Sequence, residues 1–207
     1  EDKIDNTNTC IPYLRTITRG VLHGLEILNS GNKYYLHGNI TPPNLYLKMW
    51  TGEQKVYMDN IKFNSNTYDD VNNKPSSVDM DQLGDTLIQL LIGTEKLDVI
   101  KYPIKDAFDL YVKVKEYLRS TGKYLNIKTS ALNVPSDIDS HNPKVVTKEE
   151  YLYKLSKSVF DMIYRLKNTN VEPNMQFTTP GQALKHDFLQ ISSNADVSSK
   201  EGESLGS

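Results

Sequence analysis

Four polar residues between positions 37 and 59 carry side chains that could take part in chemistry. His37 could exchange a proton near neutral pH. Asn44 and Asp59 carry oxygen atoms, the ligands that a hard cation such as Mg²⁺ prefers, and could hold the cation together with a nucleotide. Each also has a structural interpretation: His37 would be packed and hydrogen-bonded beneath a loop, and Asn44 and Asp59 would hydrogen-bond neighbouring loops. Asn39, which lies between them, carries an amide that cannot accept a proton at ordinary pH.

The elements that must position these residues are mostly helices. Apolar residues recur at steps of three and four from Ile11 to Leu28, after Thr9 as an N-cap, and predict one amphipathic helix. The remaining patterns predict, in order, a hairpin formed by 45–47 and 56–58, a surface loop at 64–78, helices at 79–92 and 105–118, a polar surface excursion at 123–146, and helices at 148–166 and 180–189. The predicted fold class is therefore mainly α with a small β-hairpin.

The composition is that of an ordinary globular chain. Its 207 residues are 38% hydrophobic and 24% charged, which predicts a domain with a core large enough to need no disulfides. The single cysteine, Cys10, cannot form an internal disulfide. Lysines and acidic residues alternate without a basic stripe, so nucleic acid is not an expected partner. The four histidines have no zinc-ligand spacing, and no apolar run is long enough to span a membrane.

The sequence around His37 resembles the catalytic loop of eukaryotic protein kinases. In that family a His-Arg-Asp triplet is followed, five residues after the aspartate, by an asparagine. Here His37, Gly38 and Asn39 occupy the triplet, and Asn44 follows five residues after Asn39. Asp59, at the end of the predicted hairpin, resembles the metal-binding aspartate of the family's Asp-Phe-Gly.

Two later parts of the chain extend the resemblance. Residues 79–84 are similar to the start of a buried kinase helix with the pattern Asp-x-Trp-x-Leu-Gly. Asp79 is then expected to anchor the loop backbone, and a role as helix N-cap is the alternative. Residues 172–178 and 183–189 resemble the family's ending, an Asp-Pro-x-x-Arg-x-Thr followed by Leu-x-His-Pro-Phe, with Gln176 in place of the arginine.

The resemblance covers residues 10–189 and implies the helical C-terminal lobe of a protein kinase. It implies no N-terminal lobe in this chain, and it leaves a polar lead-in at 1–9 and a polar tail at 190–207. The string His-Gly-x-x-Thr-Pro-x-Asn-Leu is more narrowly similar to the rhoptry kinases and pseudokinases of apicomplexan parasites. That narrower resemblance implies a secreted parasite compartment, whereas the residues alone leave the compartment undetermined.

Departures from the family pattern predict a loss of catalysis. Asn39 replaces the aspartate that accepts the substrate proton, and Gly38 replaces the arginine that ties the loop to an activation-segment phosphate. Asn60 and Ile61 replace the Phe and Gly that follow the metal-binding aspartate. Gln176 replaces the arginine that pairs with the glutamate of Ala-Pro-Glu, a triplet that is missing between 59 and 79.

The resulting interpretation is a catalytically inactive pseudokinase domain, not an enzyme, that acts as a protein-binding scaffold or allosteric regulator. Its expected partner is a protein such as a kinase or kinase substrate, docked between the helix at 105–118 and residues 123–146, and no cofactor is required. The alternative is an unorthodox kinase or nucleotide-binding transferase that retains Mg²⁺-ATP on Asn44 and Asp59. A third interpretation is a helical adaptor that matches these strings by chance. It is separated from the others by whether Asn39, Asn44 and Asp59 lie together in space.

Overall fold

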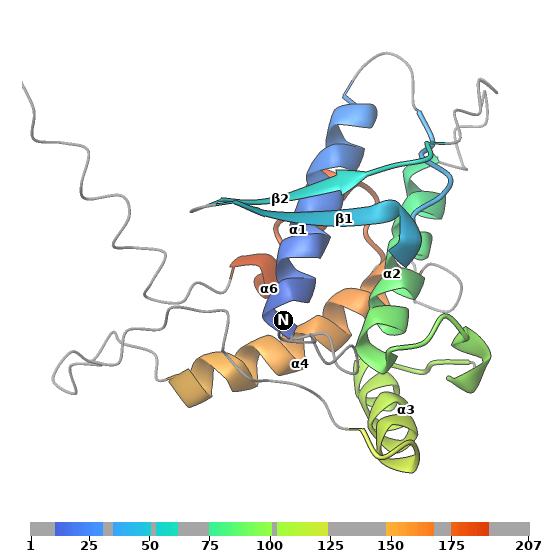
Figure 1. Ribbon diagram of the computed structural model, residues 1–207. Helices are drawn as coiled ribbons and strands as arrows, with labels where there is room; N and C mark the ends of the chain where they lie inside the picture. The colour runs from blue at the N-terminus through green and yellow to red at the C-terminus, as the bar shows by residue number, and fades with distance from the viewer. Residues whose placement is uncertain are drawn as a thin grey trace, which may run out of the picture.

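The computed structural model describes residues 11–30, 35–50, 53–61, 75–100, 103–123, 148–167 and 175–190. Within these ranges the chain is mainly helical, with one two-stranded antiparallel sheet (Figure 1). The elements are α1 (Ile11–Leu28), the 3₁₀ turn η1 (Pro42–Asn44), β1 (Leu45–Trp50), β2 (Glu53–Met58), α2 (Pro75–Ile92), η2 (Leu97–Val99), α3 (Ala107–Ser120), α4 (Lys148–Leu166), α5 (Pro180–Ala183) and α6 (Asp187–Gln190). The predicted lead-in at 1–9 and nearly all of the predicted excursion and tail lie outside the described residues.

The core forms where α1, α2 and α4 pack together, with α3 against α4 and the short helices α5 and α6 against α1. Its side chains come from the apolar face of each helix, and burying one large aliphatic side chain stabilises the fold by about 1.5 to 3 kcal/mol. The buried residues of the three long helices include Leu14, Val21, Leu25, Met80, Leu83, Leu87, Val159, Met162 and Ile163. The helix predicted at 79–92 is therefore the buried element that its apolar composition indicated.

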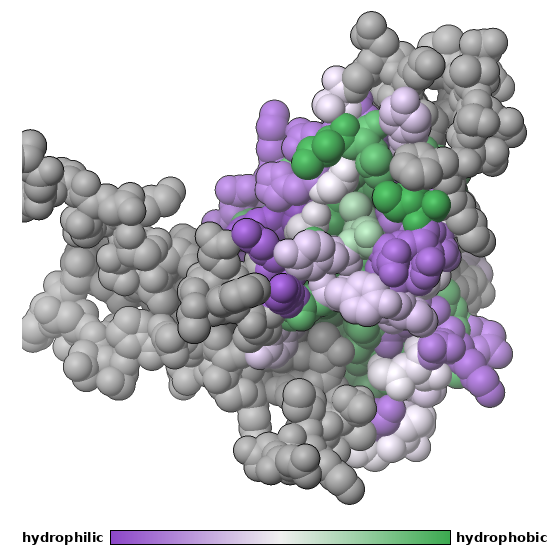
Figure 2. Space-filling view, turned by 45° about the horizontal axis from the view of Figure 1, so that its top comes forward, coloured by the Kyte–Doolittle hydropathy of each residue, from purple (hydrophilic) through white to green (hydrophobic). Residues whose placement is uncertain are grey.

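The β-hairpin lies across α1 (Figure 1). Its strands pair in register, Leu45 opposite Met58 and Tyr46 opposite Tyr57. Glycine in α1 allows the close approach, because a Cβ added to Gly20 would lie 2.5 Å from the Cβ of Val56. Tyr46 and Tyr57 are about half exposed. On this upper side of the molecule hydrophobic and hydrophilic residues lie next to one another (Figure 2).

Several predicted bounds were wrong. Both strands are longer than predicted, since β1 extends to Trp50 and β2 begins at Glu53, and α3 ends at Ser120 rather than 118. The helix α2 begins at Pro75, four residues before the predicted start, because its polar first turn gave no apolar periodicity and proline is tolerated there. The helix α3 begins at Ala107 rather than 105, because the Asp106 side chain accepts the N–H of Asp109 as an N-cap. The helix predicted at 180–189 is two short helices, since the ring of His186 accepts the backbone N–H of Phe188 and starts α6. The bounds of α1 and α4 agree with the prediction.

Candidate functional site

The segment 37–40 is held against one face of α2 by three polar side chains. The carboxylate of Asp79 accepts the backbone N–H groups of His37 at 2.9 Å and Gly38 at 2.8 Å. Farther along the helix, Oε1 of Gln82 accepts the N–H of Ile40 at 3.0 Å, and the hydroxyl of Thr86 donates to the carbonyl of Ile40 at 2.8 Å. Four backbone groups of the loop are thus satisfied by the side chains of a single helix, which fixes the loop to the core.

Asp79 is fully buried inside α2, so the expected anchoring contact is present and the N-cap alternative is wrong. Burial raises the pKa of Asp79, because the carboxylate loses water, while its two bonds from backbone N–H groups act in the opposite direction. The sequence analysis missed Gln82 and Thr86. They follow Asp79 at i+3 and i+7, a spacing that places three polar residues on one face of an otherwise apolar helix.

Gly38 has a φ of 69°, in the left-handed region that side chains rarely adopt. The position at which the kinase pattern has arginine therefore requires glycine in this backbone conformation, while its N–H is bound to Asp79. An arginine here would strain the loop, so the replacement is part of how this loop is built.

His37 lies in the core with no exposed surface, as the structural interpretation expected. The predicted hydrogen bond of its ring is wrong, because neither Nδ1 nor Nε2 has a partner in the part of the chain that the structure describes. Burial lowers the pKa of His37, because a charged imidazolium would be desolvated. The burial of the ring and its lowered pKa favour the structural interpretation over a role as acid or base.

Asn39, Asn44 and Asp59 meet where the loop joins the end of β2. The backbone carbonyl of Asn44 accepts the N–H of Asp59 at 2.9 Å, and Nδ2 of Asn44 donates to the carbonyl of Asn39 at 3.2 Å. The same Nδ2 lies 2.8 Å from the hydroxyl of Thr41. Asn39, Asn44 and Asp59 therefore lie together in space. A chance match of short strings would not require this.

Asn60 completes this cluster. Its backbone N–H donates to Oδ1 of Asp59 at 2.7 Å, and its Nδ2 donates to Oδ1 of Asn44 at 2.8 Å. Its carbonyl accepts Nδ2 of Asn39 at 3.2 Å. Asn60 thus bonds to all three residues singled out from the sequence.

These contacts test whether the cluster fits Mg²⁺. A magnesium ion needs a near-octahedral set of oxygens with a free lone pair aimed at the ion. Here Oδ1 of Asn44 and Oδ1 of Asp59 already receive N–H groups from Asn60, and Asp59 supplies the single carboxylate of the cluster. Among the described residues no group of three or more His, Cys, Asp or Glu side chains is placed to hold a metal ion. In this arrangement a Mg²⁺ ion would have to share these two oxygens with Asn60 or displace its hydrogen bonds.

Gln176 is half-buried and stands between Met175 and Phe177 in the sequence. The arginine that serves this stretch comes from α4 instead: Nε of Arg165 donates to the carbonyl of Met175 at 2.9 Å, and its guanidinium lies 4.7 Å from the centre of the Phe177 ring. The replacement at 176 therefore leaves this part of the chain anchored by another cation.

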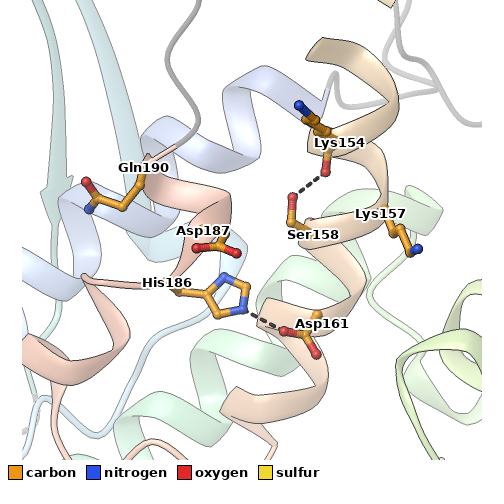
Figure 3. Close-up of a pocket in the computed structure, with 7 residues that line it drawn as sticks. All are labelled: Lys154, Lys157, Ser158, Asp161, His186, Asp187 and Gln190. Carbon is orange, nitrogen blue, oxygen red and sulfur yellow. Dashed lines mark hydrogen bonds and ion pairs between the residues drawn. The ribbon is translucent and has the colours of Figure 1, made fainter. Parts of the chain in front are cut away.

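An open pocket of about 570 Å³ lies between α4 and α6 (Figure 3). Its buried His186 points toward Asp161, with Nε2 at 2.7 Å from Oδ2, and this hydrogen bond lowers the pKa of Asp161. Because Nδ1 of His186 accepts the N–H of Phe188, the neutral ring carries its proton on Nε2. The hydroxyl of Ser158 donates to the carbonyl of Lys154. Both ring nitrogens are engaged, so the histidine acts as a structural link between the two helices.

No described helix has the length and apolar character needed to cross a membrane. No family model matches the chain, and a search of curated protein sequences finds no significant match. The resemblance to protein kinases therefore depends on the residues and contacts described above.

Proposed function

We propose that this chain is a kinase-like helical lobe that does not transfer phosphate and acts by binding another protein. The observation that carries the proposal is the state of the loop at 37–44. Its backbone is anchored to α2 as a catalytic loop would need, yet the position of the proton acceptor holds the amide of Asn39, whose Nδ2 is bonded to the carbonyl of Asn60. The loop backbone is anchored as the kinase pattern implies, but the carboxylate that would accept the proton is replaced by an amide.

Two requirements of phosphoryl transfer are unmet in this geometry. The substrate hydroxyl needs an acceptor for its proton, and an amide nitrogen is a donor only. The phosphates need a cation, and the oxygens of Asn44 and Asp59 that would bind it accept hydrogen bonds from Asn60. A transfer mechanism based on positioning would therefore need a base other than Asn39 and a cation that shares or displaces the bonds of Asn60.

The proposal is tested by a transfer assay on the full-length protein with radioactive ATP, Mg²⁺ and a mixed peptide substrate. We expect no labelling above that of a matched Asp59→Asn preparation. Asn39→Asp should not create activity, because Gly38 keeps its left-handed backbone and Asn60 still bonds to Asn44 and Asp59. Labelling by the wild-type protein that Asp59→Asn abolishes would instead establish the alternative, an unorthodox Mg²⁺-ATP enzyme.

A second arm of the assay examines nucleotide binding itself. A ligand present at one hundred times its dissociation constant stabilises a protein by about 2.7 kcal/mol, which raises the melting temperature by several degrees. We expect an unchanged melting temperature when Mg²⁺-ATP is added. A rise that disappears in Asp59→Asn would contradict this expectation and favour nucleotide binding.

For the binding role, the helix α3, which forms one side of the predicted docking surface, carries an exposed aromatic side chain in its first turn. Phe108 is 72% exposed at the first turn of α3, and its ring centre lies 6.1 Å from that of Tyr111. Exposed aromatic residues are frequent anchors of protein interfaces. We propose that the partner, a kinase or a kinase substrate, contacts this turn.

A photo-crosslinking residue placed at Phe108 tests the contact in cells. It should capture one defined protein, and the same probe at Arg119, exposed near the other end of α3, should capture much less of it. Equal capture at both positions, or none at Phe108, would contradict a docking role for this turn.

A further inference from the structure

We propose that Asn60 takes the place of a divalent cation at the junction of the loop and β2. It is a deepening of the proposed function and rests on it. Asn44 and Asp59 are the residues that the sequence assigns to a cation, and Oδ1 of each faces a hydrogen that Asn60 supplies, at heavy-atom distances of 2.8 and 2.7 Å. These N–H groups provide the positive end of a dipole where a cation would otherwise provide charge.

The backbone of Asn60 is suited to this role. Its φ is 54°, in the left-handed region that asparagine tolerates better than most residues other than glycine. In this conformation the residue bonds to Asp59 with its backbone N–H and to Asn44 with its side chain, while its carbonyl accepts Asn39. Glycine would allow the same φ without the side-chain donor, and aspartate would present an oxygen in place of that donor.

The polarity of the Asn60 side chain decides whether this junction needs a cation. Asn60→Asp turns a donor that faces Oδ1 of Asn44 into an acceptor and places a second carboxylate beside Asp59. Oxygen atoms then face one another with no positive group between them. A cation that binds oxygen ligands would relieve this repulsion, so a junction that needs no metal should become one that does.

The test is the melting temperature of the full chain in EDTA and in 5 to 10 mM MgCl₂ or MnCl₂, concentrations of about the order at which weak oxygen sites fill. The wild-type protein should melt at the same temperature in all three. Asn60→Asp should melt several degrees lower in EDTA and regain most of that loss with MnCl₂. Asn60→Asp combined with Asp59→Asn is the matched control and should regain none, because one of the two carboxylates has been removed.

Asn60→Gly keeps the backbone conformation and removes only the side-chain donor, so it covers the case in which Asn60→Asp does not fold. With Oδ1 of Asn44 released, this variant should bind at least fivefold more Mn²⁺ than wild type at equal free metal, measured by electron paramagnetic resonance. Equal binding by the two proteins would overturn the inference.

Two further results would overturn the inference. In the first, MnCl₂ raises the melting temperature of the wild-type protein but not that of Asp59→Asn. In the second, Asn60→Asp melts at the wild-type temperature under every condition. Either result without phosphate transfer would leave the proposed function standing. Phosphate transfer by a wild-type protein whose melting is insensitive to cations would overturn the proposed function and leave the role of Asn60.

Discussion

The carboxylate of Asp79 lies 2.9 Å from the backbone nitrogen of His37, a residue that precedes it by 42 positions. Its other oxygen accepts the N–H of Gly38. One buried side chain therefore fixes two successive peptide groups of the loop to the core helix α2. The same two hydrogen bonds hold the loop backbone in place, although Asn39 stands where the kinase pattern has its proton acceptor.

Replacing this carboxylate by an amide tests the anchor. Asp79→Asn keeps one acceptor oxygen and turns an NH₂ group toward the second backbone N–H, which is then buried without a partner. The expected loss is about 1 to 3 kcal/mol in the free energy of unfolding, the usual cost of one unsatisfied buried group. Urea denaturation measures it, and Asp98→Asn, at an exposed position, is the control that should change little. Equal stabilities of the two variants would contradict the anchoring role.

His37 predicts how stability depends on pH. Its folded-state pKa is lowered by burial, so below about 6.5 the unfolded chain takes up a proton that the folded chain refuses. Stability should be full above pH 6.5 and fall as the pH drops toward the folded-state pKa, by up to about 1.4 kcal/mol per pH unit. The raised pKa of Asp79 has the opposite effect on stability, between its ordinary value of 3.8 and its folded-state pKa.

The measurement is urea unfolding of wild type and His37→Met at pH 7.5 and 5.5. The methionine variant should lose less stability on acidification, and it should be as stable as wild type or more stable at pH 7.5, because an unpartnered ring is replaced by an apolar chain. His23→Gln, at an exposed site, should keep the wild-type dependence. A methionine variant with the same dependence as wild type would exclude His37 as its cause.

The sequence predicted the long helices well because their apolar faces are continuous. The predicted bounds of α1 and α4 match the structure. In α1 the apolar periodicity extends from the first residue of the helix to the last. It failed for the first turn of α2, whose sequence is Pro-Ser-Ser-Val and whose one aliphatic side chain, Val78, is exposed. Periodicity reports burial, so an exposed helical turn is invisible to it.

The residues of the candidate site could be predicted from the sequence, but the hydrogen bonds between them could not. The resemblance to the kinase loop grouped Asn39, Asn44 and Asp59, but it gave no sign that Asn60 would bond to all three, because that depends on one left-handed φ angle. The unpartnered ring of His37 was likewise hidden, since a short motif does not say what surrounds a side chain.

The close packing of the hairpin on α1 predicts the effect of adding one methyl group. Gly20→Ala removes a glycine from the middle of a helix, which by itself should stabilise by about 1 kcal/mol. The new Cβ would lie 2.5 Å from the Cβ of Val56, an atom fixed to its backbone, so the strand must move away. We expect a net loss of about 1 to 3 kcal/mol, typical of overpacking.

Gly24→Ala is the matched control for this variant, one helical turn further along. Its new Cβ would meet the terminal methyl of Met58, the far end of a flexible side chain that can turn aside. Thermal unfolding should therefore show a clear loss for Gly20→Ala and little loss for Gly24→Ala. The reverse order would show that the hairpin does not pack on α1 as described.

Lys167 connects the end of α4 to α2, and its charge should be worth more than that of a surface lysine. Its Nζ lies 3.1 Å from Asp81 and 2.6 Å from Asp85, and the side chain is 9% exposed. Lys167→Met keeps the stem and removes the charge, which leaves two carboxylates one helical turn apart without their cation. Because both carboxylates are partly exposed, we expect a loss of about 1 to 3 kcal/mol, below the 3 to 5 of a fully buried broken pair. Asp81→Asn added to Lys167→Met should recover part of the loss by removing the repulsion, and a double variant less stable than the single one would contradict this account.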